Sequence, residues 1–212
     1  CLGGAKNHMI VVPDADIDST AKGLLASSMG SAGQRCMAAS VAVGVADVDP
    51  IIDQLIEEAK KYVLGVDMGT IISRPAFDRI KGYIDNAENM GAKILVDGRN
   101  STPPEGYDNG YWLGPTILDD VSPDWPCAKE EIFGPVLSII RTDTIDKAMK
   151  IENNNIYGNA AAVFTTSGEV AKTISETASA GMVGINIGVP VPREPYSFGG
   201  WNESKYGHGD IT

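Results

Sequence analysis

Three loops of the sequence carry side chains that could do chemistry, and the first ends on a thiol. Residues 30–36 read Gly-Ser-Ala-Gly-Gln-Arg-Cys. A cysteine in a glycine-rich turn can expose its sulfur to a cleft, where amide N–H groups and Arg35 could stabilise a thiolate or a developing oxyanion. The competing interpretation is a buried cysteine that fills core space, and from this spacing alone it is the better one. Cys36 is a candidate nucleophile that needs support from elsewhere in the chain.

The other two loops suit a cofactor and a substrate entrance. Residues 129–136 read Lys-Glu-Glu-Ile-Phe-Gly-Pro-Val. A carboxylate can accept hydrogen bonds from ribose hydroxyls, and a Phe face can pack beside nicotinamide. A solvated charge pair before a core strand explains this loop equally well. The aromatic residues and paired glycines of residues 195–201 could line an entrance to the nucleophile, although a packed surface loop would have the same composition.

Other chemistries are not expected. His8 and His208 are the only histidines, and the chain contains no HExxH, GxSxG or GxxxxGK[ST] motif. A metal site or a serine hydrolase is therefore not predicted. The chain also has no GxGxxG motif after a strand, so it supplies no dinucleotide-binding fold of its own.

The composition bears on which binding partners and which cellular compartment are expected. The net charge of −11 over 212 residues argues against a nucleic-acid partner, which needs clustered Lys and Arg. No apolar run is long enough to cross a membrane, and the start lacks a signal pattern. Three widely spaced cysteines favour reduced thiols over disulfides. We expect a cytoplasmic protein, with an organelle matrix as the alternative.

The elements that position these loops alternate between strand and helix. Alternation of this kind predicts an α/β fold with a parallel-rich sheet and helices on its faces. In such sheets ligands gather at the carboxyl ends of strands, which directs attention to loops beside strand ends. We expect strands at residues 9–12, 40–45, 93–96, 136–140, 160–164 and 182–187, and helices at residues 17–29, 49–63, 73–91, 144–153 and 167–179.

Four motifs, taken together, resemble the aldehyde dehydrogenase superfamily. LGGAKN, GQRC, EEIFGPV and SFGG occur in that order over nearly the whole chain. The resemblance implies that residues 1–212 form the catalytic domain, an open three-layer α/β sandwich. It further implies an NAD-binding domain before this segment, an oligomerisation strand after it, and a homo-oligomeric parent. Because the chain opens at Cys1 directly into LGGAKN, we expect a fragment.

The resemblance also assigns roles. Cys36 corresponds to the nucleophile, Glu131 to the carboxylate that holds the nicotinamide ribose, and Phe133 to its aromatic neighbour. Arg35 and Phe198 correspond to substrate contacts. The family's second oxyanion donor, an Asn side chain, would belong to the absent segment, which leaves the backbone N–H of Cys36.

Within the superfamily, AKNH, VVPDAD, GQRCMA, NNN-x-YGN and VGIN-x-GVPVP resemble the coenzyme A-acylating methylmalonate-semialdehyde dehydrogenase branch. Hydrolytic members carry a Glu immediately before Leu-Gly-Gly, where this chain has Cys1 and Leu2. Without that general base, a coenzyme A thiol is the more reasonable acyl acceptor than water.

The implied function is oxidation of malonate or methylmalonate semialdehyde to an acyl-CoA through a cysteine thioester, with NAD as cofactor. Two alternatives remain. A hydrolytic semialdehyde dehydrogenase would release a free acid. The isolated 212 residues could also be a catalytically silent folded module, and for the isolated chain we favour this interpretation.

Overall fold

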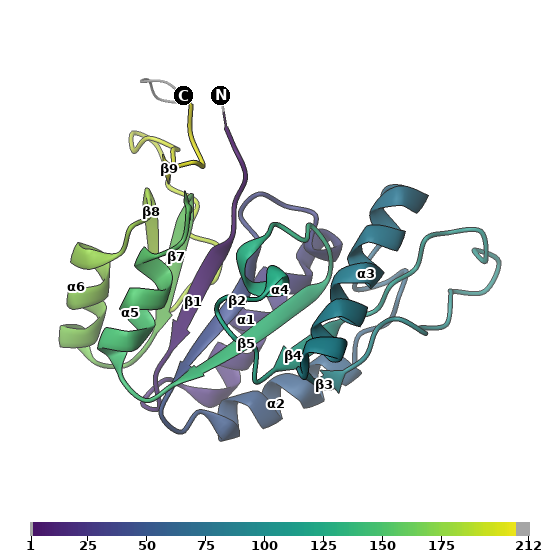
Figure 1. Ribbon diagram of the computed structural model, residues 1–212, viewed down its shortest axis with the longest axis horizontal. Helices are drawn as coiled ribbons and strands as arrows, with labels where there is room; N and C mark the ends of the chain where they lie inside the picture. Colours follow the sequence, from purple (N-terminus) through teal and green to yellow (C-terminus); the bar gives the residue numbers. More distant parts are fainter. Residues whose placement is uncertain (1, 207–212) are drawn as a thin grey trace.

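The computed structural model describes residues 2–206 and contains a seven-stranded sheet in the order β3-β4-β5-β2-β1-β7-β8 (Figure 1). All neighbouring strands pair in parallel except β3, which is antiparallel to β4. A small second sheet joins β6 to β9. The strands are β1 Asn7–Val11, β2 Ala39–Val45, β3 Lys93–Val96, β4 Thr116–Asp119, β5 Val136–Thr142, β6 Tyr157–Gly158, β7 Ala160–Phe164, β8 Met182–Ile185 and β9 Trp201–Asn202.

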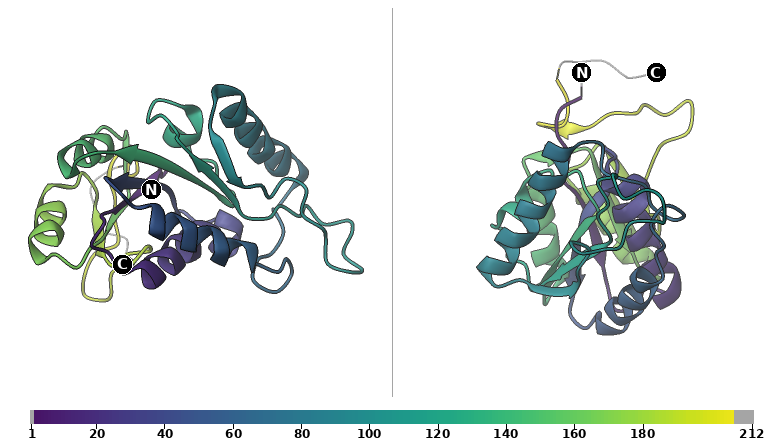
Figure 2. Two further views of the ribbon diagram at one scale, coloured as in Figure 1. Left: turned by 90° about the horizontal axis from the view of Figure 1, so that it is seen from below. Right: turned by 90° about the vertical axis from the view of Figure 1, so that its right-hand side faces the viewer.

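Helices cover both faces of the large sheet (Figure 2). The chain steps from β1 to β2 through a helix on one face, and from β5 to β7 and β8 through helices on the other, as right-handed crossovers require. The predicted three-layer α/β fold is confirmed. One face carries α1 Ile17–Met29 and α2 Asp49–Lys60, and the other carries α3 Arg74–Met90, α4 Pro126–Lys129, α5 Ile145–Asn153 and α6 Gly168–Thr177.

Local signals explain most helix ends. Ser73 Oγ accepts the Ala76 N–H and caps α3, which stops at Gly91 with a left-handed φ of 106°. Asp49 before Pro50 predicts an N-cap for α2, and this prediction is wrong, because Asp49 is the first helical residue and its carboxylate binds Arg141 at 2.6 Å instead. That helix also ends before residue 63, whose N–H donates to Asp67 Oδ2 at 2.7 Å and so belongs to the next turn.

Buried polar residues occur at one edge of the large sheet, although its central strands are buried and mostly apolar. β1 and β7 are buried along their whole length, as strands covered on both faces must be. Buried polar side chains nevertheless collect where β1 begins, at Lys6, Asn7 and His8. Burying a polar group is costly unless it has a hydrogen-bond partner, so such a cluster needs a reason. A functional site at this edge of the sheet would be one. Among residues 2–206, no helix is long and apolar enough to cross a membrane.

Candidate active site

The three chemistry-bearing loops meet at the amino ends of the parallel strands. Cys36 lies three residues before β2 begins, and Glu131 lies in the segment that leads into β5. In Figure 1 the β1 arrow runs from the upper edge of the sheet to the lower edge. The candidate loops do not lie at the carboxyl ends, where ligands of such sheets usually gather, because they lead into strands rather than out of them.

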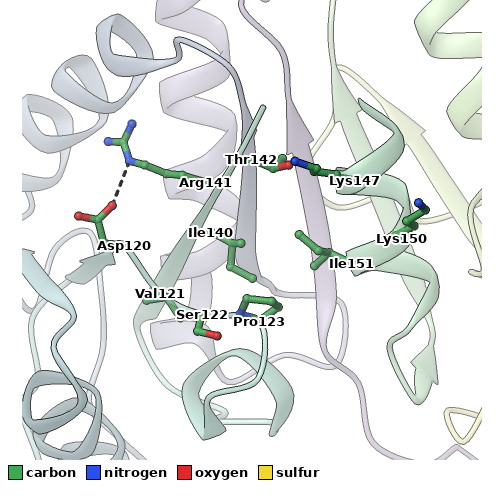
Figure 3. Close-up of a pocket in the computed structure, with 10 residues that line it drawn as sticks. All are labelled: Asp120, Val121, Ser122, Pro123, Ile140, Arg141, Thr142, Lys147, Lys150 and Ile151. Atoms are coloured by element: carbon green, nitrogen blue, oxygen red, sulfur yellow. Dashed lines mark ion pairs between the residues drawn. The ribbon is translucent and has the colours of Figure 1, made fainter. Parts of the chain in front are cut away.

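The carboxyl edge has a hollow of its own, between the end of β5, the segment after β4, and α5 (Figure 3). Its cationic side chains are largely neutralised. Arg141 pairs with Asp119 at 2.8 Å and with Asp49 at 2.6 Å, and Lys147 pairs with Asp143 at 2.8 Å. An anion would compete with these carboxylates, so the hollow gives no reason to place the chemistry there.

The Cys36 thiol stands open at a turn. The Ala38 N–H donates to the Arg35 carbonyl at 3.1 Å, which closes a turn with Cys36 near its tip. The side chain is exposed. The backbone N–H of Cys36 has no hydrogen-bond partner among residues 2–206. An open sulfur beside a free amide donor suits a nucleophile that must stabilise the oxyanion it creates.

Iodoacetamide is expected to alkylate Cys36 faster than Cys127. Cys127 is 1% exposed, and burial raises the pKa of its thiol, so both access and thiolate content are low there. Peptide mass mapping after short exposures measures the two rates in one sample. Urea-unfolded protein is the control, because unfolding should make both cysteines react. Equal rates in the folded protein would contradict the open geometry of Cys36.

Backbone contact joins the Cys36 loop to the Glu131 loop. Gly33 has a φ of 66°, and a Cβ built on it would lie 2.0 Å from the carbonyl oxygen of Gly134. Only glycine permits so close an approach. On its other side the Cys36 loop is tied to residues 70–72, because Gln34 accepts the Ile72 N–H at 2.9 Å and donates to the Thr70 carbonyl at 3.1 Å.

The Glu131 loop presents a carboxylate and an aromatic face. Burial raises the pKa of Glu131, while the Ala5 N–H and the charges of Lys6 and Arg79 act in the opposite direction. Phe133 is 39% exposed and holds a φ of 54°, a strained conformation for a non-glycine residue. Such strain clusters at ligand sites. The roles of Glu131 as ribose acceptor and of Phe133 as its aromatic neighbour stay predictions.

Arg35 precedes Cys36 in the turn, and Phe198 packs near the residue that follows Cys36. Arg35 Nη2 donates to the carbonyl oxygens of Ala26 and Ser27 at 2.8 and 2.9 Å, so it also satisfies the C-terminal turn of α1. Phe198 is half-buried in a small apolar cluster that includes Met37, the residue after Cys36. The substrate roles of Arg35 and Phe198 stay predictions.

Two asparagines were not predicted as site residues. Asn7 Nδ2 and Asn159 Nδ2 each donate to the Cys36 carbonyl oxygen at 3.0 Å. Both lie in motifs, AKNH and NNN-x-YGN, that sequence reasoning used only as marks of resemblance. The type and spacing of these residues give no sign that their side chains converge on one carbonyl.

Lys6 was missed as well. It is 1% exposed, and its Nζ has no hydrogen-bond partner among residues 2–206. Burial lowers its pKa to about 8, while electrostatic interactions with Cys127, Glu131 and Glu130 raise it. A cation is thus held close behind the Glu131 loop at a cost in stability.

Replacing Lys6 with methionine is expected to stabilise the protein by up to about 3 kcal/mol at pH 7, since the lysine pKa falls from about 10.5 to about 8 on folding. The folded protein binds a proton at Lys6 less tightly than the unfolded chain does. Lys6 therefore destabilises the wild type fully below pH 8, and this destabilisation disappears as the pH rises towards 10.5. Urea unfolding of the wild type and variant at several pH values measures the difference. The surface variant Lys129→Met is the control, and a difference that does not shrink with pH would contradict the assignment.

No group of three or more His, Cys, Asp or Glu that could hold a metal ion occurs within the described part, residues 2–206. The model of the aldehyde dehydrogenase family matches residues 2–212. The chain belongs to this family.

Relatives within the aldehyde dehydrogenase family are named for semialdehydes. The chain is 42% identical to the malonate-semialdehyde dehydrogenase of Pseudomonas aeruginosa, over 97% of this chain and 43% of the relative. It is 45% identical to the mitochondrial methylmalonate-semialdehyde/malonate-semialdehyde dehydrogenase [acylating] of Bos taurus, over 93% of this chain and 38% of the relative.

Solved structures confirm the aldehyde dehydrogenase fold. The methylmalonate-semialdehyde dehydrogenase of Oceanimonas doudoroffii superposes with a TM-score of 0.95 at 43% identity, over 99% of this chain and 44% of that one. A 1-pyrroline-5-carboxylate dehydrogenase from Thermus, solved with bound NAD, gives 0.84 at 28% identity, over 95% of this chain and 39% of that one. The chain spans less than half the length of the relatives it matches.

Proposed function

We propose that this chain is the catalytic part of a longer dehydrogenase that oxidises malonate or methylmalonate semialdehyde to an acyl-CoA. The observation that carries the proposal is the Cys36 turn, in which an exposed thiol and a free backbone N–H lie on a loop in contact with the Glu131 loop. The names of the Pseudomonas and Bos taurus relatives support the substrate class. The acylating relative supports coenzyme A as acyl acceptor.

Cys36 performs the covalent steps. Its thiolate adds to the aldehyde carbon and forms a C–S bond, while the carbonyl electron pair moves to oxygen, where the Cys36 N–H donates to it. Bound NAD supplies the chemistry of a hydride acceptor. Cys36 then holds the acyl group as a thioester. Attack by the coenzyme A thiolate breaks the bond to Cys36 and returns its sulfur as thiolate.

The residues present fit one end of NAD. Glu131 offers a half-buried carboxylate that can accept hydrogen bonds from ribose hydroxyls, and Phe133 offers an open ring face for the nicotinamide. The sequence has no GxGxxG motif for the rest of the dinucleotide. We assign that part to an NAD-binding domain of the same polypeptide, and we propose that the parent is a homo-oligomer.

Arg35 and Phe198 complete the proposed substrate side. Arg35 would meet the carboxylate of the semialdehyde with the part of its guanidinium that α1 does not use, and Phe198 would line the approach beside Met37. Cys1, which stands where hydrolytic members have their base, lies outside the described residues. The cytoplasmic location stays a prediction.

Product analysis tests the acyl acceptor. The complete polypeptide is incubated with malonate semialdehyde and NAD, with and without coenzyme A, and the products are separated by mass. We expect an acyl-CoA thioester whose formation requires coenzyme A. Free acid as the main product despite added coenzyme A would favour the hydrolytic alternative, and absence of NAD reduction would overturn the proposal. The isolated 212 residues are expected to reduce no NAD, since most of the cofactor contacts are assigned elsewhere.

A further inference from the structure

The carbonyl oxygen of Cys36 accepts hydrogen bonds from two side chains that lie at the starts of neighbouring strands. Asn7, the first residue of β1, and Asn159, the residue before β7, each donate an Nδ2–H to it at 3.0 Å. A carbonyl oxygen has two lone pairs, so two donors satisfy it fully. We call Asn7, Asn159 and this oxygen the carbonyl clamp.

Both asparagines are themselves fixed. Asn7 Nδ2 also donates to the Ala38 carbonyl at 3.0 Å, and Asn7 Oδ1 accepts the Ala160 N–H at 3.0 Å. Asn159 Nδ2 also contacts Met37 Sδ at 3.3 Å. Asn7 is 2% exposed and Asn159 is 5% exposed. The clamp therefore connects the residues after Cys36 to two neighbouring strands of a rigid sheet.

The sheet itself is irregular at this point. The pairing of β1 with β2 shifts register between Asn7 and His8. Such irregularities occur beside active sites, where they change the direction of a side chain. Here the shift coincides with the residue whose side chain reaches across to the Cys36 turn, which is a second observation in favour of a specific role for that turn.

We propose that Asn7 and Asn159 are positioning residues for the nucleophile: by holding the Cys36 carbonyl towards the sheet, they keep the Cys36 sulfur and N–H on the open side of the turn. This inference rests on the proposed function of Cys36. Without the clamp, the peptide plane after Cys36 is free to rotate and can turn its carbonyl oxygen towards the exposed side of the turn, where the thiol lies. A partial negative charge there would oppose both the thiolate and the oxyanion.

A purely structural role makes a different prediction. If the asparagines only join strands, their loss lowers stability and leaves the reactivity of Cys36 unchanged once the protein is folded. If they position Cys36, reactivity falls in the folded protein. The two roles are therefore separated by readouts at the sulfur itself.

Asn159→Ala is the principal test, because no backbone N–H within residues 2–206 donates to the Asn159 side chain, whereas Asn7 also accepts the Ala160 N–H. In the complete polypeptide we expect the single-turnover rate of NAD reduction to fall roughly 10- to 100-fold, since a misplacement near 1 Å has effects of this size. The KM for NAD should change little. Alkylation of Cys36 by iodoacetamide should slow severalfold, with Cys127 still protected as evidence of folding.

Asn155→Ala is the matched control. Asn155 Nδ2 donates to the Lys6 carbonyl at 2.6 Å and Asn155 Oδ1 accepts the Tyr157 N–H at 3.0 Å, so the variant removes side-chain hydrogen bonds near the start of β1, none of which involves Cys36. It should lose stability and keep the reactivity of Cys36. If Asn159→Ala does not fold, Asn159→Ser provides a milder loss with the same expected direction.

The outcomes separate the clamp from the reaction. Alkylation needs neither aldehyde nor NAD, so it reports on the clamp even if the wild type oxidises no semialdehyde, which would overturn the proposed function alone. Unchanged alkylation and unchanged single-turnover rates in a folded Asn159 variant would overturn the clamp. Equal slowing in Asn155→Ala would also overturn it, because the effect would then be general loosening.

Discussion

Replacing Cys36 with serine in the complete polypeptide is expected to lower the rate of NAD reduction by roughly 10⁴-fold or more, because the covalent step is removed. A serine hydroxyl stays protonated at neutral pH and needs a base to become a nucleophile. His8 is the only histidine among residues 2–206, and burial lowers its pKa to about 3. The His8 Nδ1 contacts Asn155 Nδ2 at 3.2 Å and, in the described part of the chain, makes no hydrogen bond with the Cys36 turn, so His8 cannot act as that base. Absorbance of the reduced cofactor measures the loss.

Cys127→Ala is the matched control for the thiol. Cys127 is buried in α4, and its removal should cost a small cavity rather than the chemistry. We expect this variant to keep the wild-type rate within about threefold. The cavity lowers the free energy of unfolding, and a stability loss at a site without contact to Cys36 acts independently of the reaction. Substantial turnover by Cys36→Ser, or loss of turnover by Cys127→Ala alone, would require a different nucleophile.

The sequence predicts the fold well where a local signal repeats. α1 has the predicted bounds, because Asp16 accepts the Ser19 N–H at its start and apolar residues recur along its length. β3 and β7 also begin and end as predicted. The four-residue helix α4 and the two-residue strands β6 and β9 were not predicted, because segments this short show no period.

The candidate site was likewise predictable only where residue types and motifs carry a signal. Cys36, Glu131 and Phe133 are recognisable as candidates because their residue types suggest chemistry and their motifs occur in a known order. The edge of the sheet that carries them was not predicted, since which end of a strand faces a ligand depends on the whole topology. The carbonyl clamp was not predicted either, because Asn7 and Asn159 meet at Cys36 across more than a hundred residues of chain.

Replacing Gly33 with alanine is expected to reduce NAD reduction by about 100-fold and to destabilise the protein by at least about 1–2 kcal/mol. Gly33 holds a φ of 66°, where a Cβ is strained. That Cβ would also lie 2.0 Å from the Gly134 oxygen and 2.4 Å from its carbon, both backbone atoms that cannot rotate away. The Cys36 and Glu131 loops would have to separate by about 1 Å, a misplacement of the size that costs this much rate. Single-turnover kinetics and thermal unfolding measure the two effects.

Gly82→Ala is the control: it is the same glycine-to-alanine change at a position that does not join the two loops. Gly82 lies inside α3, and a Cβ added there would meet no heavy atom of the described residues within 4 Å other than those of its chain neighbours and its own helix backbone. Alanine favours a helix over glycine by up to about 1 kcal/mol, so this variant should be slightly more stable and fully active. If Gly33→Ala lost stability but kept its rate, the contact would hold the fold together without aligning the thiol with the cofactor loop. Loss of both, beside an active Gly82→Ala, would instead tie the reactivity of Cys36 to the distance between two loops that lie a hundred residues apart in the chain.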